Sequence, residues 1–186
     1  HVAPLILLDG WCESISYDGV FIDNTDAACS ATKYLIDHGH ERIGYLKGDF
    51  RIAAFRYRER GVRQALERQK MPYDPAYEVT VGTTVTSAYE DMKKYLAEKR
   101  ELPTAFFADN DVIACSAVRA MKEAKIRVPE DVSIVAFDDV PFSTMANPAL
   151  TTVHVYRQEM GETAVRRLLD NINYNNHVKT KIQVCS

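Results

Sequence analysis

The feature that most constrains this chain is a regular alternation of short apolar segments with longer amphipathic ones. The short segments are apolar on both faces, as buried parallel strands are, and the long ones repeat apolar residues at helical spacing. We expect strands at residues 4–8, 20–22, 42–46, 77–81, 104–108, 132–137, 151–155 and 181–184, and helices at 25–38, 56–69, 86–99, 110–124 and 158–173. Strands that alternate with single helices predict an open, doubly wound α/β fold with a parallel sheet.

Several helix starts carry capping signals. Asn24 or Thr25 can cap the first helix, and a capping box from Ser87 to Glu90 can begin the third. Asp111 is expected to cap the fourth. The irregular segment after residue 137 is the one disruption of the alternation, so the strand and helix that follow it could belong to a different sheet.

Charge and cysteine content exclude some classes of protein. The chain has 186 residues and a formal net charge of −3, unlike a surface that binds nucleic acid or acidic membranes. Its longest apolar run, residues 4–8, is too short to cross a bilayer. The cysteines are dispersed, with no C-x-x-C pair, so free thiols in a reducing cytoplasm are expected rather than disulfides or a metal site: Cys12, Cys29, Cys115 and Cys185.

Polar side chains follow every predicted strand. Because parallel strands end at one edge of a sheet, where open α/β folds bind ligands, these groups should converge. Each one alone is equally well explained as a helix cap or a solvated turn. Together, carboxylates, an amide and a guanidinium match the vicinal hydroxyls of a sugar, whose ring face Trp11 or Phe21 could cover. The candidate polar residues after strands include Asp9, Asp23, Arg58, Asn110 and Asp138.

Catalytic interpretations have less support. The chain has no G-x-G-x-x-G, no phosphate-binding P-loop and no G-x-S-x-G, and its histidines show no ligand spacing. A Mg²⁺-dependent phosphotransfer site remains an alternative, built on Asp109, Asp111, Asp138 and Asp139. We expect a protein that is not an enzyme and that needs no cofactor or metal.

Five ordered blocks of sequence resemble the effector-binding core of the lac-repressor family of bacterial transcription regulators. The resemblance runs from about residue 4 to residue 184, and its most telling block is "VSIVAFDD…NPALTTV". The blocks are "VFIDN…AACSATKYLIDHGHERIGYLKG", "RERGVRQAL", "PTAFFADNDVIACSAV", "VPEDVSIVAFDDVPFSTMANPALTTV" and "EMGETAVRRLLDNI".

The resemblance implies two α/β subdomains, joined by three chain crossovers, with a small effector in the cleft between them. Residues 1–22 would be a remnant of the N-terminal subdomain and residues 23–150 the C-terminal, effector-binding subdomain. Residues 151–176 would supply a crossover strand and a helix of the N-terminal subdomain, and residues 177–186 a return strand. The implied effector-binding residues are Asp9, Phe21, Asp23, Arg58, Asn110 and Asp138, with Trp11, Phe50 and Thr83 as possible further contacts.

The sequence also departs from the family pattern. Thr83 stands where many members place a stacking aromatic, and no helix-turn-helix is present. The chain therefore looks like an excised fragment that contacts operator DNA only through a headpiece outside it. The expected partners are a small effector, for which a sugar is expected, and a second copy of the chain in a homodimer. The alternative is an extracytoplasmic sugar-binding protein of a transporter.

Overall fold

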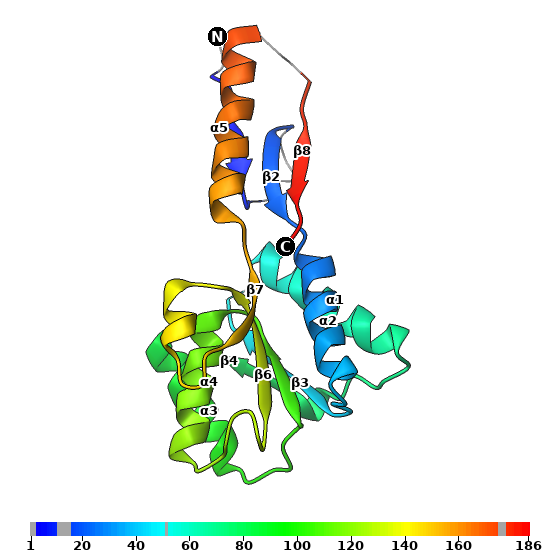
Figure 1. The fold of residues 1–186 in the computed structure, drawn as a ribbon, viewed down its shortest axis with the longest axis vertical. Helices are drawn as coiled ribbons and strands as arrows, with labels where there is room; N and C mark the ends of the chain where they lie inside the picture. The colour runs from blue at the N-terminus through cyan, green and yellow to red at the C-terminus, as the bar shows by residue number, and fades with distance from the viewer. Residues whose placement is uncertain (1–2, 11–15, 51, 175–177) are drawn as a thin grey trace. The chain divides into compact units, whose positions relative to one another are not determined.

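The structure is a computed structural model that describes residues 3–10, 16–50, 52–174 and 178–186. The chain divides into two compact units (Figure 1). The smaller unit comprises His1–Asp23 and Val155–Ser186, and the larger unit is Asn24–His154. Both contain parallel sheets with helices, which confirms the predicted α/β fold class. The assignment of these units to subdomains stays a prediction.

The larger unit contains a five-stranded parallel sheet in the order β4-β3-β5-β6-β7. In Figure 1, helices α1 and α2 lie together on one side of this sheet, and α3 and α4 lie together on the other. The strands are β3 (Ile43–Gly48), β4 (Glu78–Val81), β5 (Ala105–Ala108), β6 (Ser133–Asp138) and β7 (Thr151–His154). The helices are α1 (Asn24–Asp37), α2 (Ala53–Arg68), α3 (Val85–Ala97) and α4 (Asp111–Glu123), with short 3-10 turns at Pro75–Tyr77 and Pro141–Met145.

Both faces of this sheet are buried at its centre, where β5 is buried in every position and β3 and β6 in most of theirs. In β5, Phe106 joins the core cluster shared with α3 and α4, whereas Phe107 lies beside Tyr45, whose hydroxyl reaches α2. Tyr45, Phe106, Phe107 and Phe137 are all almost completely inaccessible to solvent. Such two-sided burial is what the continuous apolar runs of the sequence predict.

The order of the strands creates a topological switch point. From β3 the chain passes through α2 to β4 on one side, and later returns through α3 to β5 on the other side of β3. The connections that leave β3 and β5 therefore run in opposite directions, which opens a crevice outside the carboxyl ends of these two strands. This crevice is the position at which the fold can present a ligand site.

Helices α1 and α2 pack closely because α2 carries Gly61. A Cβ built on Gly61 would lie 2.2 Å from the carbonyl oxygen of Thr25 and 2.9 Å from the Cβ of Ala28. The missing side chain thus allows two helix backbones to approach where any larger residue would collide. This contact holds the middle of α2 against the start of α1.

The smaller unit is a three-stranded parallel sheet with one helix. Its strands are β1 (Ile6–Leu8), β2 (Asp18–Ile22) and β8 (Lys181–Val184), in the order β1-β2-β8, and α5 (Arg157–Tyr174) packs on β1 and β2. Asp18 is fully buried and accepts hydrogen bonds from Arg167, Asn171, Lys179 and Thr180. Although burial opposes it, these bonds hold the pKa of the Asp18 carboxyl below its ordinary value. A single carboxylate therefore joins β2, α5 and the segment that leads into β8.

Two capping predictions were wrong. The cap of α3 is Thr84, which forms a reciprocal capping box with Ser87, so the box lies three residues before the predicted one. The cap of α4 is Asn110 rather than Asp111. In both cases the cap is the residue immediately before the first helical residue, because that residue has the extended backbone that a cap requires.

The strand after the irregular segment stays in the larger sheet. β7 pairs in parallel with β6, Phe137 opposite Val153. The possibility of a different sheet is therefore excluded for this strand, although α5, which follows it, belongs to the smaller unit. Of the four cysteines, Cys29, Cys115 and Cys185 are free thiols, and Cys12 lies outside the described residues. In the described part of the chain, no helix is both long and apolar enough to cross a membrane.

Candidate functional site

Arg58 is the centre of the polar groups at the carboxyl edge of the larger sheet. Its side chain is only 4% exposed, and each guanidinium nitrogen donates a hydrogen bond to a different element. Nε donates to Asn24 Oδ1 at 2.9 Å, Nη1 to the backbone oxygen of Asp109, and Nη2 to Asp138 Oδ1 at 3.1 Å. Arg58 thus connects the start of α1 with the ends of β5 and β6.

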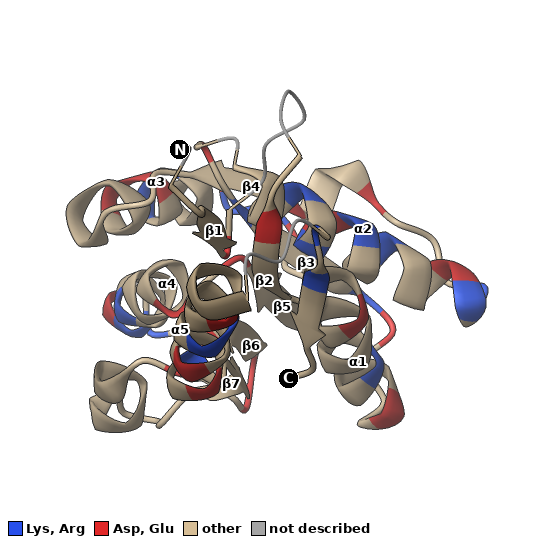
Figure 2. Ribbon diagram, turned by 90° about the horizontal axis from the view of Figure 1, so that it is seen from above, with Lys and Arg blue, Asp and Glu red and all other residues tan. Residues whose placement is uncertain are grey.

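Aromatic rings keep this guanidinium in place. Its central carbon lies 3.7 Å from the centroid of the Phe137 ring and 5.8 Å from that of Phe55. An arginine stacked on a ring loses hydration on one face but gains a cation–π attraction. The other arginines of α2 are exposed, and Figure 2 shows acidic residues among the basic ones on this helix. Arg58 is therefore distinguished from its neighbours by burial.

Asp109 is a buried acid that supports the site through hydrogen bonds to β3. Its carboxylate is completely buried and accepts hydrogen bonds from the Tyr45 hydroxyl at 2.5 Å and from the Gly48 backbone N–H at 2.8 Å. Burial raises the pKa of Asp109 to about 7, although these hydrogen bonds and the charge of Arg58 oppose the shift. Asp109 therefore joins the ends of β3 and β5 at the switch point, and its protonation changes near neutral pH.

Asp138, the last residue of β6, and Asp139, which follows it, have different partners. Asp138 is paired with Arg58, whereas Asp139 accepts hydrogen bonds from the Ser143 hydroxyl at 3.3 Å and contacts His154 Nδ1 at 2.6 Å. Both have a left-handed backbone, with φ of 113° at Asp138 and 49° at Asp139. This change of chain direction separates one carboxylate that serves the arginine from one that holds the following loop.

Asn110 lies next to this group but has a structural task as well. Its side-chain oxygen accepts a hydrogen bond from the Ile113 N–H at 2.9 Å and so caps α4. Among the described residues, none accepts a hydrogen bond from its side-chain NH₂ group. The amide that was predicted to face a ligand can therefore still do so, with its NH₂ group as a donor.

Two of the possible contacts also belong to the larger unit. Phe50 follows β3 and is 65% exposed, and Thr83 follows β4 and is half-buried. A Cβ on Gly48 would lie 2.5 Å from the Phe55 ring and 3.1 Å from the methyl carbon of Thr83. The absence of a side chain on Gly48 thus allows the side chains of Phe55 and Thr83 to approach the end of β3.

The remaining predicted residues belong to the smaller unit. Asp9 is exposed, has φ of 51°, and donates its backbone N–H to Val20. Phe21 is half-buried, with its ring edge-on to Tyr17 at 6.3 Å between centroids, and Asp23 accepts a hydrogen bond from Gln183. Trp11 lies outside the described residues. The participation of these residues in the same ligand site as Arg58 stays a prediction.

Sequence reasoning missed the direct partners of the arginine. Asn24 was considered only as a helix cap, yet its oxygen binds Arg58. Phe137 was considered only as part of a buried strand, and Asp109 only as one of the acids after a strand and as part of an alternative metal site. A signal was available in their positions, since Asp109 directly follows β5 and Asn24 lies two residues after β2. Among the described residues, no group of three or more side chains is placed to hold a metal ion.

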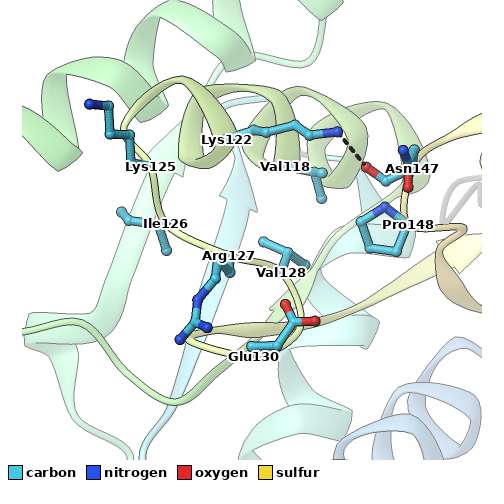
Figure 3. Close-up of a pocket in the computed structure, with 9 residues that line it drawn as sticks. All are labelled: Val118, Lys122, Lys125, Ile126, Arg127, Val128, Glu130, Asn147 and Pro148. Atoms are coloured by element: carbon cyan, nitrogen blue, oxygen red, sulfur yellow. Dashed lines mark hydrogen bonds between the residues drawn. The ribbon is translucent and has the colours of Figure 1, made fainter.

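A pocket of about 570 Å³ lies elsewhere on the larger unit, between the end of α4 and the loops before β6 and β7 (Figure 3). None of the predicted site residues lines it. Lys122 spans it and donates a hydrogen bond to the Asn147 carbonyl at 3.3 Å, while Lys125 and Arg127 extend away from the apolar side chains of Val118 and Val128. Its polar groups do not converge, so the carboxyl edge remains the candidate site.

Residues 32–186 match the family model of the periplasmic binding protein-like domain. The chain belongs to this family. Within the periplasmic binding protein-like family it is 35% identical over 171 residues to the HTH-type transcriptional repressor PurR of Haemophilus influenzae (strain PittEE), which covers 92% of this chain and 50% of the relative. It is 33% identical over 172 residues to the repressor CytR of Escherichia coli (strain K12), with the same coverage.

Solved structures of the same type superpose on nearly the whole chain. The transcriptional regulator CelR in complex with cellobiose gives a TM-score of 0.88 at 27% identity, over 100% of this chain and 64% of the other. A LacI family regulator from Enterococcus faecium with bound ribose gives 0.88 at 25% identity, over 98% and 67%. These matches confirm the resemblance to a lac-repressor effector-binding core. The chain spans about half the length of the curated relatives that it matches.

Proposed function

We propose that this chain is the effector-sensing part of a DNA-binding transcription regulator, and that it binds a small polyhydroxylated molecule, most simply a sugar. The observation that carries the proposal is the cluster of Arg58, Asp138 and Asn110 at the carboxyl edge of the larger sheet. This edge lies at the topological switch point, where open α/β sheets bind their ligands. The relatives named as repressors, and the neighbours solved with cellobiose and ribose, support the same function.

The hydrogen-bonding capacity of this cluster suits hydroxyl groups. A guanidinium has five N–H donors, and three of those of Arg58 have partners among the described residues. The other two can donate to ligand oxygens, as can the NH₂ group of Asn110. The ionised carboxylate of Asp138 is an acceptor with two oxygens. Adjacent donors and an acceptor match vicinal hydroxyls, each of which both accepts and donates.

The same groups do not form a catalytic arrangement. Arg58 is held by four neighbours, and Asp138 is paired with a cation that never loses its proton. The cluster therefore has no side chain poised both to attack a substrate and to be activated by a neighbouring base. We propose a binding protein rather than an enzyme, acting in the cytoplasm without a metal or cofactor.

The partners of the whole regulator are part of this proposal. Operator DNA would be bound by residues outside the 186 studied, because a chain with net charge −3 offers no basic surface for DNA. A homodimer is expected by analogy with the family. A transporter's sugar-binding protein is not favoured, because the curated relatives above 30% identity are named as repressors.

Binding can be tested by isothermal titration calorimetry against D-ribose, cellobiose, other pentoses, hexoses and disaccharides, and nucleosides. We expect one class to bind with micromolar to millimolar affinity, and Asp138→Ala to weaken it by about ten- to a hundredfold, the loss of a charge-assisted hydrogen bond. Asp131→Ala is the matched control, since Asp131 is also paired with an arginine but lies at the opposite edge of the sheet. Equal affinity in wild type and Asp138→Ala would contradict the site.

A further inference from the structure

We infer that Asp111 and Thr152 are positioning residues for Asp138: they hold the turn after β6 so that the Asp138 carboxylate faces Arg58. The inference rests on the proposed function only in what Asp138 does there. The turn itself is unusual, because two successive residues other than glycine, Asp138 and Asp139, have positive φ. Such conformations are disfavoured for residues with a Cβ and persist only where their surroundings hold them.

The carboxylate of Asp111 supplies part of that hold. It is 1% exposed, and its two oxygens have two different partners. Oδ2 accepts a hydrogen bond from the Val140 backbone N–H at 2.8 Å, and Oδ1 accepts one from the Thr152 hydroxyl at 2.5 Å. Although Asp111 is the first residue of α4, it does not cap that helix, because Asn110 does. Its side chain therefore serves the turn.

Thr152 completes the connection. Its Oγ1 donates to Asp111 and accepts a longer hydrogen bond, of 3.4 Å, from the Asp139 backbone N–H. Asp111 and Thr152 together thus bind two consecutive backbone N–H groups, those of Asp139 and Val140. Because β7 pairs in register with β6, Thr152 is fixed opposite Ala136, two residues before Asp138. The turn is therefore anchored to two rigid elements, α4 and β7.

The buried acid has an evident cost, which argues that it has a task. Burial raises the pKa of Asp111, and the nearby charges of Asp138 and Asp139 raise it further. Asp139 is itself held away from the arginine by Ser143 and His154, so Asp138 is the acid of this turn that pairs with Arg58. Without the Asp111–Thr152 connection, the strained turn can relax and withdraw Asp138 from the guanidinium.

The test separates positioning from simple structural support. Thr152→Val removes the hydroxyl with little change of shape, Thr152→Ser retains it, and Asp111→Asn weakens the acceptor. Thr151→Val is the matched control, because Thr151 is exposed on the same strand. In ¹⁵N-labelled protein without ligand, we expect Thr152→Val and Asp111→Asn to accelerate hydrogen exchange at the Val140 amide and at the Arg58 Nη2 hydrogens, which bind Asp138, by about tenfold or more, and Thr152→Ser and Thr151→Val to leave both unchanged.

Ligand binding provides the second measurement, with D-ribose and cellobiose as probes. Thr152→Val should weaken whichever probe binds by about three- to tenfold in the wild-type background. It should have no further effect in Asp138→Asn, since Thr152 acts through Asp138. Faster exchange at Val140 with an unchanged Arg58 signal would overturn the inference, as would equal weakening in both backgrounds. If neither probe binds wild type, the proposed ligand class fails while the exchange measurement still decides the role of Asp111 and Thr152.

Discussion

The Arg58 guanidinium lies flat against the ring of Phe137, with its central carbon 3.7 Å from the ring centroid. A group that was expected to serve a ligand is therefore also part of the hydrophobic core. Phe137 is fully buried near the end of β6, and Arg58 covers that end of the strand. Truncating Arg58 should therefore cost stability as well as ligand binding.

Arg58→Ala and Asp138→Ala should now behave differently. Removing Arg58 leaves the buried oxygens of Asn24 and Asp109 without their donor and exposes Phe137, so we expect the free energy of unfolding to fall by about 3 kcal/mol. Because Asp138 is partly exposed, Asp138→Ala should lower the free energy of unfolding by only about 1 kcal/mol or less, while it still weakens ligand binding. Urea unfolding of both variants measures this, and equal stability losses would contradict it.

Stability should fall as the pH rises towards neutrality. Asp109 has a folded pKa of about 7 against an ordinary value of 3.8, so the folded chain keeps a proton that the unfolded chain has released. Its stabilising contribution is complete below the ordinary pKa and is lost as the pH approaches 7, with a slope of at most about 1.4 kcal/mol per pH unit. The raised pKa of Asp111 acts with the same sign.

This pH dependence can be assigned by mutation. Urea unfolding from about pH 5 to about pH 8 should show a smaller slope in Asp109→Asn than in wild type. Asp131→Asn is the control, because Arg127 holds the pKa of that exposed carboxyl at about 2, below the window. A slope that persists in Asp109→Asn would show that other groups cause it.

Two glycines in helices should respond in opposite directions to alanine. Gly61→Ala should destabilise the chain by about 1–3 kcal/mol, because the new methyl group meets the Thr25 carbonyl and one of two packed helices must move. Gly161→Ala in α5 should stabilise by about 0.5–1 kcal/mol, because nothing lies within 4 Å of the new carbon. Thermal melts of both variants test the close approach of α1 and α2, and a neutral Gly61→Ala would refute it.

The smaller unit should promote self-association. Val165, Leu169 and Ile172 recur at helical spacing along α5, and each is at least half exposed, as is Leu8. A stripe of this kind favours contact with another apolar surface. Sedimentation should show concentration-dependent association that Leu169→Glu weakens, while Arg166→Glu, at an exposed charged position, leaves it intact. A monomer at every concentration would contradict the prediction.

The sequence predicted what depends on periodicity and could not predict what depends on three-dimensional neighbours. Each strand and helix was expected within a few residues of its place, because burial on both faces leaves a continuous apolar run. The role of Asp111 was missed because capping is a local rule that Asn110 satisfies equally well. The bond from Arg58 to Asn24 spans two helices, so no local pattern reports it.

The site residues show the same division. That Arg58 and Asp138 lie at one edge follows from parallel strands ending together. That the arginine would lie over Phe137 and bind Asn24 depends on the close packing of α1 and α2, which Gly61 permits. The strained turn at Asp138 and Asp139 has no sequence signal, since glycine or asparagine is the usual residue there.

The two units differ in how they can be made on the ribosome. The larger unit is one uninterrupted stretch, whereas the smaller unit is assembled from segments on either side of it. Domains generally fold as units while the chain emerges, so residues 24–154 can fold before α5 and β8 have been translated. Until then β2 lacks its neighbour β8, and the buried Asp18 lacks Arg167 and Lys179. β1 and β2 are therefore made before the larger unit, yet β2 reaches its final partners only after that unit is complete.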